Sequence, residues 1–146
     1  MTETFKTILW LDDMRTPVES EGVTVVRNYE EFVAYLDRLA PGEFPDLISF
    51  DHDLALEHYP RDTEEQAKGI PYHTYKEPTG LHCAYYIVDN FLPLRHWTVH
   101  SWNPEGRQNI ERKLGSYCRS GWVREFEIPF RTDPIPGVSP EGWRIS

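Results

Sequence analysis

Short apolar runs at residues 7–11, 47–50 and 97–99 each end in a group of polar residues. Those groups contain aspartates, histidines and a serine: Asp12, Asp13, Asp51, His52, Asp53, His100 and Ser101. Apolar runs of this length are typical of buried parallel strands, and ligands bind just beyond the carboxyl ends of such strands. If the strands are parallel, these polar side chains meet at one edge of a sheet.

The aspartates have the chemistry of a divalent-cation site. At one sheet edge the carboxylates of Asp12, Asp13 and Asp51 would repel one another, and a bound cation relieves that repulsion. Mg²⁺ prefers oxygen ligands of this kind. The alternative is that these aspartates cap loops and accept local hydrogen bonds, as aspartates commonly do.

The histidines offer acid–base chemistry. His52 and His100 would lie at the same edge, and an imidazole titrates near neutral pH. Beside a bound phosphate, one ring could activate water while the other protonates the leaving oxygen. The sequence does not assign the two roles, and the alternative is a pair of ordinary buried or surface histidines.

The start of the last predicted helix favours an anion site. Asn103 is a good N-cap, and the free N–H groups at a helix start attract anions. Ser101, Asn103 and Arg107 could therefore bind phosphate, with Arg107 making a two-point contact. Arg15 could contact the same anion or simply neutralise Asp12. The alternative is an ordinary helix cap beside a surface arginine.

Periodicity and turn residues place these side chains on alternating strands and helices. Strands are predicted at 7–11, 23–27, 47–50, 97–100 and 121–128, and helices at 29–39, 80–92 and 104–117. Such alternation implies an α/β fold with a mainly parallel, five-stranded sheet. With strand order 2-1-3-4-5, the helices all cover one face. The helices that would normally follow strands one and five are missing.

We expect residues 1–146 to form a single domain, with an irregular insertion at 55–78 and a proline-rich tail at 129–146. The sheet face without helices needs cover, because large exposed apolar patches are rare in monomers. We expect the tail to pack there or to extend into a partner, which leaves a homodimer possible. The candidate side chains for that contact are Phe130, Ile135 and Trp143.

The insertion carries residues that could cover the site: His58, Tyr72, His73 and Tyr75. A lid of this kind would close over bound substrate. A solvated loop anchored by a few aromatic side chains is the favoured interpretation. A turn of helix is expected within it at 63–68.

Charge and cysteine content narrow the class of protein. The formal net charge of −9 argues against binding along a nucleic-acid backbone, which requires clustered Lys and Arg. A small nucleotide or an RNA end held through a cation remains compatible with it. Cys83 and Cys118 share no motif, and we interpret them as reduced thiols, which suggests a cytoplasmic protein. No signal peptide and no membrane-spanning stretch are expected.

Three motifs carry a resemblance to a known family: LDDMRTP at 11–17, SFDHDL at 49–54 and VHSWNPEGR at 99–107. Their placement resembles the receiver fold of response regulators, which is flavodoxin-like. The chain is more similar to a divergent group, the cyclic-phosphate-processing receiver domain, for which a role on nucleotide cyclic phosphates has been proposed. The resemblance covers the first, third and fourth predicted strands and the start of the last helix.

The resemblance implies specific ligands. In receivers, an acidic pair and the aspartate after strand three bind Mg²⁺, and a Ser or Thr after strand four contacts the phosphoryl group. These roles would fall on Asp12, Asp13, Asp51 and Ser101. The backbone carbonyl of Asp53 would be a further metal ligand.

Receivers also carry a Lys before a Pro at the end of strand five, where this chain has Ile128 before Pro129. A phosphorylated aspartate would lack its usual counter-charge. Stable phosphorylation of Asp51 by small phosphodonors is therefore not expected.

These observations favour a metal-assisted phosphoesterase acting on a cyclic phosphate of a nucleotide or RNA end, with Mg²⁺ or another divalent cation polarising a phosphate oxygen. One alternative is a non-catalytic receiver-like module that signals or senses phosphate. Another is a structural protein that binds a partner through its open sheet face. Hydrolysis of a 2′,3′-cyclic nucleotide would favour the first, and phosphorylation of Asp51 the second.

Overall fold

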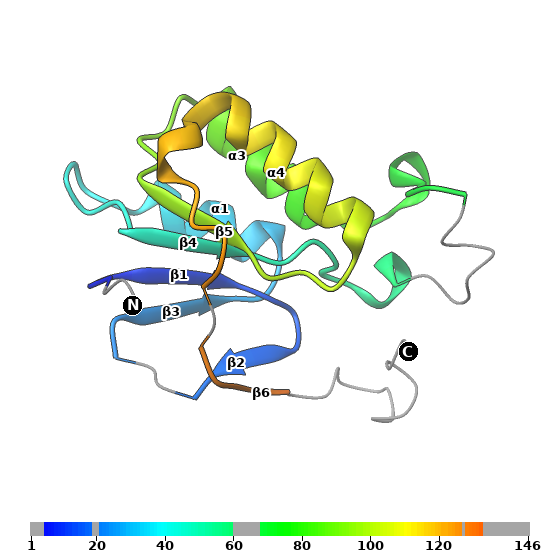
Figure 1. The fold of residues 1–146 in the computed structure, drawn as a ribbon, viewed down its shortest axis with the longest axis horizontal. Helices are drawn as coiled ribbons and strands as arrows, with labels where there is room; N and C mark the ends of the chain where they lie inside the picture. Colours follow the sequence, from blue (N-terminus) through cyan, green and yellow to red (C-terminus); the bar gives the residue numbers. More distant parts are fainter. Residues whose placement is uncertain (1–4, 19–20, 60–67, 127, 133–146) are drawn as a thin grey trace.

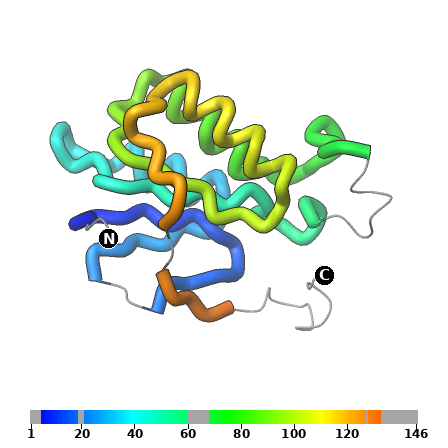
Figure 2. The backbone as a smooth tube through the Cα atoms, in the orientation of Figure 1, coloured from blue at the N-terminus to red at the C-terminus, as the bar shows by residue number. Residues whose placement is uncertain are grey.

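A computed structural model describes residues 5–18, 21–59, 68–126 and 128–132, and Figures 1 and 2 show how they are arranged. A four-stranded parallel sheet forms the centre. Its strands, in spatial order, are β3 (Val23–Val26), β1 (Ile8–Leu11), β4 (Leu47–Phe50) and β5 (His96–Val99). The predicted α/β class and the parallel order of the first four strands are confirmed.

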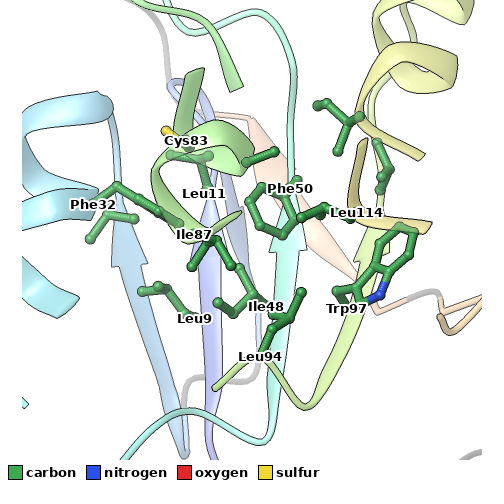
Figure 3. Packing of buried hydrophobic residues seen from close by; sticks show 14 of the residues in the cluster. Leu9, Leu11, Phe32, Ile48, Phe50, Cys83, Ile87, Leu94, Trp97 and Leu114 are labelled. Atoms are coloured by element: carbon green, nitrogen blue, oxygen red, sulfur yellow. The ribbon is translucent and has the colours of Figure 1, made fainter. Parts of the chain in front are cut away.

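Alternate residues of these strands face a layer of helices. Side chains along a strand alternate between the two sheet faces, so one set enters the core. On β1, Leu9 and Leu11 are fully buried, and the register places them beside Ile48 and Phe50 of β4. Figure 3 shows this set meeting Trp97 of β5 and the apolar side chains of the helices.

The helices on that face are α1 (Tyr29–Asp37), α3 (Gly80–Asp89) and α4 (Pro104–Cys118). Each begins at its predicted N-cap: Asn28, Thr79 and Asn103. These side chains accept hydrogen bonds from backbone N–H groups of the first helical turn, which would otherwise have no partner. The caps fix where α3 and α4 start, and both starts border the carboxyl end of β4.

Two glycines allow that close approach. An added Cβ at Gly80 would lie 1.8 Å from the carbonyl oxygen of Asp51, and one at Gly106 would lie 2.4 Å from Cγ of His52. The Gly80 N–H also donates to the carbonyl of His52 at 2.7 Å. The chain after β4 is therefore clamped between the first turns of α3 and α4.

The fifth strand predicted at 121–128 is largely absent from the described residues. After the short helix η3 (Arg119–Gly121), one parallel bridge joins Trp122 to Trp97, and the Val123 N–H donates to the Trp97 carbonyl at 2.8 Å. The charged residues Arg124 and Glu125 are exposed and break the apolar pattern. The chain then leaves the sheet edge and runs across to the far side of the fold (Figure 1).

Two segments predicted to be irregular pair as short strands instead. β2 (Arg15–Pro17) and β6 (Phe130–Thr132) form an antiparallel ribbon. The pairing joins residues more than 100 positions apart, so no local pattern predicts it. The Phe130 ring lies 6.5 Å from that of Trp10, on the sheet face without helices, as expected for the start of the tail. Ile135 and Trp143 lie outside the described residues.

Within its described residues, the insertion forms the short helices η1 (Leu56–His58) and η2 (Tyr72–Thr74). His58 is buried, with Nδ1 accepting from the N–H groups of Leu54 and Ala55. The turn expected at 63–68 falls, up to residue 67, outside the described part of the chain. None of the helices that the structure describes combines the length and apolar character needed to cross a membrane.

Candidate functional site

The carboxyl ends of β1, β4 and β5 bring three polar side chains together. One ligand atom each from Asp12, Asp51 and His100 lies within 4.8 Å of the others. Each residue directly follows its strand, and the strands are neighbours in a parallel sheet. The predicted meeting of polar residues at one sheet edge is thus found, with these residues, hereafter the Asp12–Asp51–His100 cluster, at its centre. Carboxylates and imidazoles are common metal ligands, so the cluster could hold a metal ion.

Asp12 is the most heavily bonded member of the cluster. Its side chain is fully buried, and Oδ1 accepts from the N–H groups of Met14 and Arg15 at 2.9 Å each. Its Oδ2 lies 2.7 Å from Nε of Arg15 and 3.0 Å from Nε2 of His100. Burial raises the pKa of Asp12, but these contacts with His100 and Arg15 outweigh it and leave the pKa lowered. Asp12 is therefore an ionised carboxylate near neutral pH.

Arg15 supplies a positive charge inside the cluster. Besides the contact with Asp12, its Nη2 lies 3.3 Å from Oδ1 of Asp51 and its Nη1 donates to the carbonyl of His100 at 3.3 Å. The side chain is only 6% exposed. Of the two roles considered for Arg15, neutralising carboxylates is the one this geometry displays.

Asp51 is buried and less acidic than an ordinary aspartate. Its Oδ1 accepts from the His52 N–H at 2.9 Å. Burial and the charge of Asp12 raise the pKa of Asp51 well above its usual value, against the opposing charge of Arg15. A carboxyl group in this state readily holds a proton, and a cation that binds to it displaces that proton.

Asp13 borders the cluster and contacts the insertion. Its carboxylate accepts a hydrogen bond from the Tyr59 hydroxyl, at 2.9 Å to Oδ1. Burial, followed by the charge of Asp12, raises the pKa of Asp13 to about 7. The side chain therefore changes charge near neutral pH; its predicted role as a metal ligand, which rests on its position after the first strand and on the resemblance to receivers, stays a prediction.

His100 is held in place by Trp10, Ser49 and Asp12. Its ring stacks on Trp10, with centroids 3.9 Å apart, and its Nδ1 lies 2.6 Å from Oγ of Ser49. Burial lowers the pKa of His100 and outweighs the opposing effect of Asp12. A neutral ring that donates from Nε2 to ionised Asp12 accepts from Ser49 at Nδ1. This tautomer satisfies both ring nitrogens.

His52 does not join the cluster, which revises the expectation of two neighbouring catalytic histidines. Its ring is fully buried against Gly106 of α4, on the helix side of the sheet. Its Nδ1 lies 2.7 Å from Oδ1 of Asp53, and its Nε2 lies 2.7 Å from the Tyr72 hydroxyl. His100 stacks on Trp10, on the other side. His52 therefore links the end of β4 to α4 and to the insertion.

The predicted phosphate-binding residues organise the start of α4. The Oγ of Ser101 accepts from the Asn103 N–H at 3.1 Å, and Asn103 Nδ2 donates to Oδ1 of Asp53 at 3.2 Å. The Asp53 side chain is thus directed to the helix start, away from the cluster. Arg107 pairs with Glu111 at 3.1 Å, and its side chain is 39% exposed. Of these residues, Arg107 has the side chain most accessible to an anion.

Sequence reasoning missed several supporting residues. The Arg27 Nη1 donates to the carbonyls of Asp12 and Arg15, at 3.2 and 3.1 Å, and thereby fixes the loop after β1. Arg27 ends a predicted strand, and nothing local marks it as a loop clamp. Ser49, which orients His100, was visible as the single polar residue within an apolar run.

Comparison with known proteins agrees with this geometry. A family model described as "Cyclic-phosphate processing Receiver domain" matches residues 7–116. The match spans more than half of the chain, from β1 into α4, and includes the whole Asp12–Asp51–His100 cluster. No curated protein and no solved structure matches the chain.

Proposed function

The chain belongs to the cyclic-phosphate processing receiver family, and on that basis we propose that it is a metal-assisted phosphoesterase for a cyclic phosphate of a nucleotide or RNA end. The observation that carries the proposal is the Asp12–Asp51–His100 cluster, whose ligand atoms lie within 4.8 Å of one another. Each member follows a different parallel strand, the usual position of a site in such sheets.

The donor set suits a divalent cation. The carboxylates of Asp12 and Asp51 offer the oxygen ligands that Mg²⁺ and Mn²⁺ prefer, and the His100 ring beside them is left to exchange protons. The raised pKa of Asp51 fits this view, because a buried carboxyl group that is costly to ionise alone is stabilised beside a cation. When bound, such a cation would polarise a phosphate oxygen and stabilise the charge that develops on it.

Arg15 would bind the substrate phosphate once a cation occupies the cluster. It now pairs with both carboxylates of the cluster. A cation held by the same carboxylates would release the guanidinium, whose planar fork matches a phosphate group. Arg15 would then bind the anion, which is the role predicted for it, and Arg107 could add a second positive charge from the start of α4.

His100 and Asp13 are the best-placed groups for proton transfer. His100 is the one histidine whose ring nitrogens the described residues bring into the cluster. Asp13 is next to Asp12 in the chain, and its pKa of about 7 suits acid–base catalysis at neutral pH. His52 would position Asp53 and the insertion instead of exchanging protons with substrate.

The reaction is the opening of a five-membered cyclic phosphodiester. Water adds to phosphorus, one ring P–O bond breaks, and the product is a phosphomonoester with a free neighbouring hydroxyl. One group removes a proton from the attacking water, and the other gives a proton to the leaving ribose oxygen. No oxidant or further co-substrate is needed.

Phosphorus NMR tests the proposal directly. The protein is incubated with 2′,3′-cyclic AMP in Mg²⁺, Mn²⁺ or Zn²⁺, or in excess chelator, and the monoester signal is followed. We expect turnover that depends on the metal, is lost in Asp51→Asn and persists in Asp89→Asn, a control at an exposed aspartate on α3. Cyclic nucleotide that neither binds nor reacts with any metal would refute the proposal.

A phosphate-sensing module without turnover is the second candidate. It is favoured by the burial of His52, whose two ring nitrogens already have partners, since this removes one of two expected catalytic histidines. Binding of cyclic phosphate without hydrolysis would support it. Phosphorylation of Asp51 is not expected in either case, because Ile128 stands where receivers carry a Lys, and because the Asp51 side chain is 4% exposed and paired with Arg15. Ready formation of a fluoroberyllate complex at Asp51 would support signalling.

A further inference from the structure

An exposed tryptophan stands beside the cluster. Trp102 follows Ser101 at the end of β5 and is 74% exposed, whereas Ser101 is 4% exposed. The centroid of its ring lies 4.5 Å from Cζ of Arg15. The Phe130 ring, 37% exposed, lies 5.3 Å from the same carbon and 6.4 Å from the Trp102 ring.

This grouping sets Trp102 apart from other exposed apolar residues. Phe91 is more exposed, at 84%, but it lies in the turn after α3, at the end of the sheet away from the cluster. Tyr85 packs under Lys113 on the outer side of the helix layer. Scattered exposed aromatics of that kind need no explanation. Trp102 and Phe130, by contrast, converge on the arginine that pairs with both carboxylates of the candidate site.

The position of Phe130 is fixed by the same ribbon that carries Arg15. β2 pairs with β6, which sets Pro17 opposite Phe130 and Arg15 opposite Thr132. The guanidinium therefore meets carboxylates at its nitrogen atoms and aromatic rings over its carbon. Stacking of this kind is favourable, yet it leaves most of the Trp102 surface open to solvent.

We propose that Trp102, flanked by Phe130, is a stacking surface for a nucleobase, so that the site selects nucleoside cyclic phosphates over cyclic phosphates without a base. The inference rests on the proposed function. A phosphate contacting Arg15 would lie next to Trp102, within reach of the base of the same nucleotide. Base–aromatic stacking tolerates any base, so the platform gives affinity for nucleotides without choosing among them.

The net charge of the chain supports a role for base stacking in ligand affinity. With a formal net charge of −9, general attraction for phosphate groups is weak. Affinity for a single nucleotide must then come from a few contacts at the cluster and from the apolar face of the base. Trp102 is the exposed tryptophan that the structure describes beside the cluster, and it supplies such a face.

Calorimetry with paired ligands tests the inference. The ligands are adenosine 2′,3′-cyclic phosphorothioate and methyl β-ribofuranoside 2′,3′-cyclic phosphorothioate, which differ only in carrying adenine or a methoxy group at C1′ and turn over slowly. Each is titrated in Mg²⁺ into wild type, Trp102→Ala, Trp102→Phe and the exposed control Phe91→Ala. We expect Trp102→Ala to weaken the nucleoside ligand by roughly 5- to 150-fold and to leave the base-free ligand within about twofold. Trp102→Phe should restore most of the affinity, and Phe91→Ala should change neither ligand.

Two outcomes would overturn the inference and leave the proposed function standing. One is equal binding of both ligands by wild type. The other is an equal loss for both ligands in Trp102→Ala, which would show that Trp102 only holds Arg15 in place. Binding of neither ligand by wild type would refute the proposed function and the platform together. Thermal melting of each variant confirms that the folded protein is compared.

Discussion

Replacement of Arg15 by glutamine tests whether this side chain neutralises the cluster. The change removes the positive charge that lies 2.7 Å from Asp12 and 3.3 Å from Asp51, at a side chain 6% exposed. Breaking a buried ion pair from one side typically costs about 3–5 kcal/mol, because the remaining charge stays buried without a partner. Since the raised pKa of Asp51 lets it take up a proton, we expect a smaller loss of about 2–4 kcal/mol at pH 8.

The pH dependence has a definite sign. Without Arg15, the raised folded-state pKa of Asp51 rises further above its unfolded value, and the lowered pKa of Asp12 loses part of its depression. A carboxyl group with a raised folded pKa contributes stability at acid pH that is lost as the pH increases. The difference between wild type and Arg15→Gln should therefore be largest at pH 8 and shrink towards pH 5. Chemical denaturation in chelator at both pH values measures it.

Arg95 provides the matched control. It pairs with Asp46 at 3.2 Å, but its side chain is 60% exposed. Exposed ion pairs of this kind contribute at most about 1 kcal/mol, so Arg95→Gln should cost little at either pH. A loss in Arg15→Gln no larger than that in Arg95→Gln would refute the buried-pair argument.

Metal binding supplies a second measurement on the same variant. If Arg15 and a cation compete for Asp12 and Asp51, removing Arg15 should tighten metal binding by about tenfold or more, which corresponds to about 1.4 kcal/mol. Mn²⁺ titration by calorimetry gives the affinity, and the rise in Tm with metal should be larger in Arg15→Gln than in wild type. Weaker metal binding in the variant would show that Arg15 and the cation do not share these ligands.

Four further changes give separate tests. Asp51→Asn should raise the Tm in chelator, more at pH 8 than at pH 5, since the raised pKa of Asp51 makes its ionised form costly; it should also abolish the metal-dependent rise in Tm. A pKa raised to about 7 means that Asp13 contributes stability below pH 4 that is lost by pH 7, at most about 4 kcal/mol; Asp13→Asn should flatten that decline in denaturation measured without metal. His100→Ala should lower hydrolysis roughly 100- to 10,000-fold with the fold retained. His52→Ala should chiefly destabilise, by about 2–4 kcal/mol from the cavity and lost hydrogen bonds, and a rate loss like that of His100→Ala in a stable protein would contradict this.

Local patterns were enough to predict the scaffold. The apolar runs that became β1, β4 and β5 are short and end in polar residues, and helix starts were marked by Asn28, Thr79 and Asn103. Caps and periodicity act over a few residues, so they can be read from the chain alone. The same reasoning located the sheet edge where Asp12 and Asp51 meet.

Long-range pairing limited the rest of the prediction. β2 meets β6 through contacts between residues 15–17 and 130–132, and neither segment has a strand pattern of its own. The bond from Arg27 to the loop after β1 is equally remote from any local pattern. The prediction of a strand at 121–128 was wrong because a local pattern was present but the long-range pairing was not. Its apolar residues fit a strand, but the chain turns away after Val123 to reach β6.

Strand alternation, continued one or two residues beyond the end of each strand, would have separated the two histidines. Ile48 and Phe50 face the helices, so His52, two residues further on, is directed to the same side. On β5 the helix-facing residues are Trp97 and Val99, which sends His100 to the opposite side.

The same rule places the cluster on one face. By alternation, Asp12 is directed to the same sheet face as Trp10, and Asp51 to the same face as Ser49. His100 contacts both Trp10 and Ser49, so it lies on that face too. This is the face that none of the described helices covers. A helix after β1 would occupy the space where Arg15 reaches the carboxylates and where Phe130 reaches Trp10. The helix missing after the first strand is therefore the feature that leaves room for the short ribbon beside the cluster.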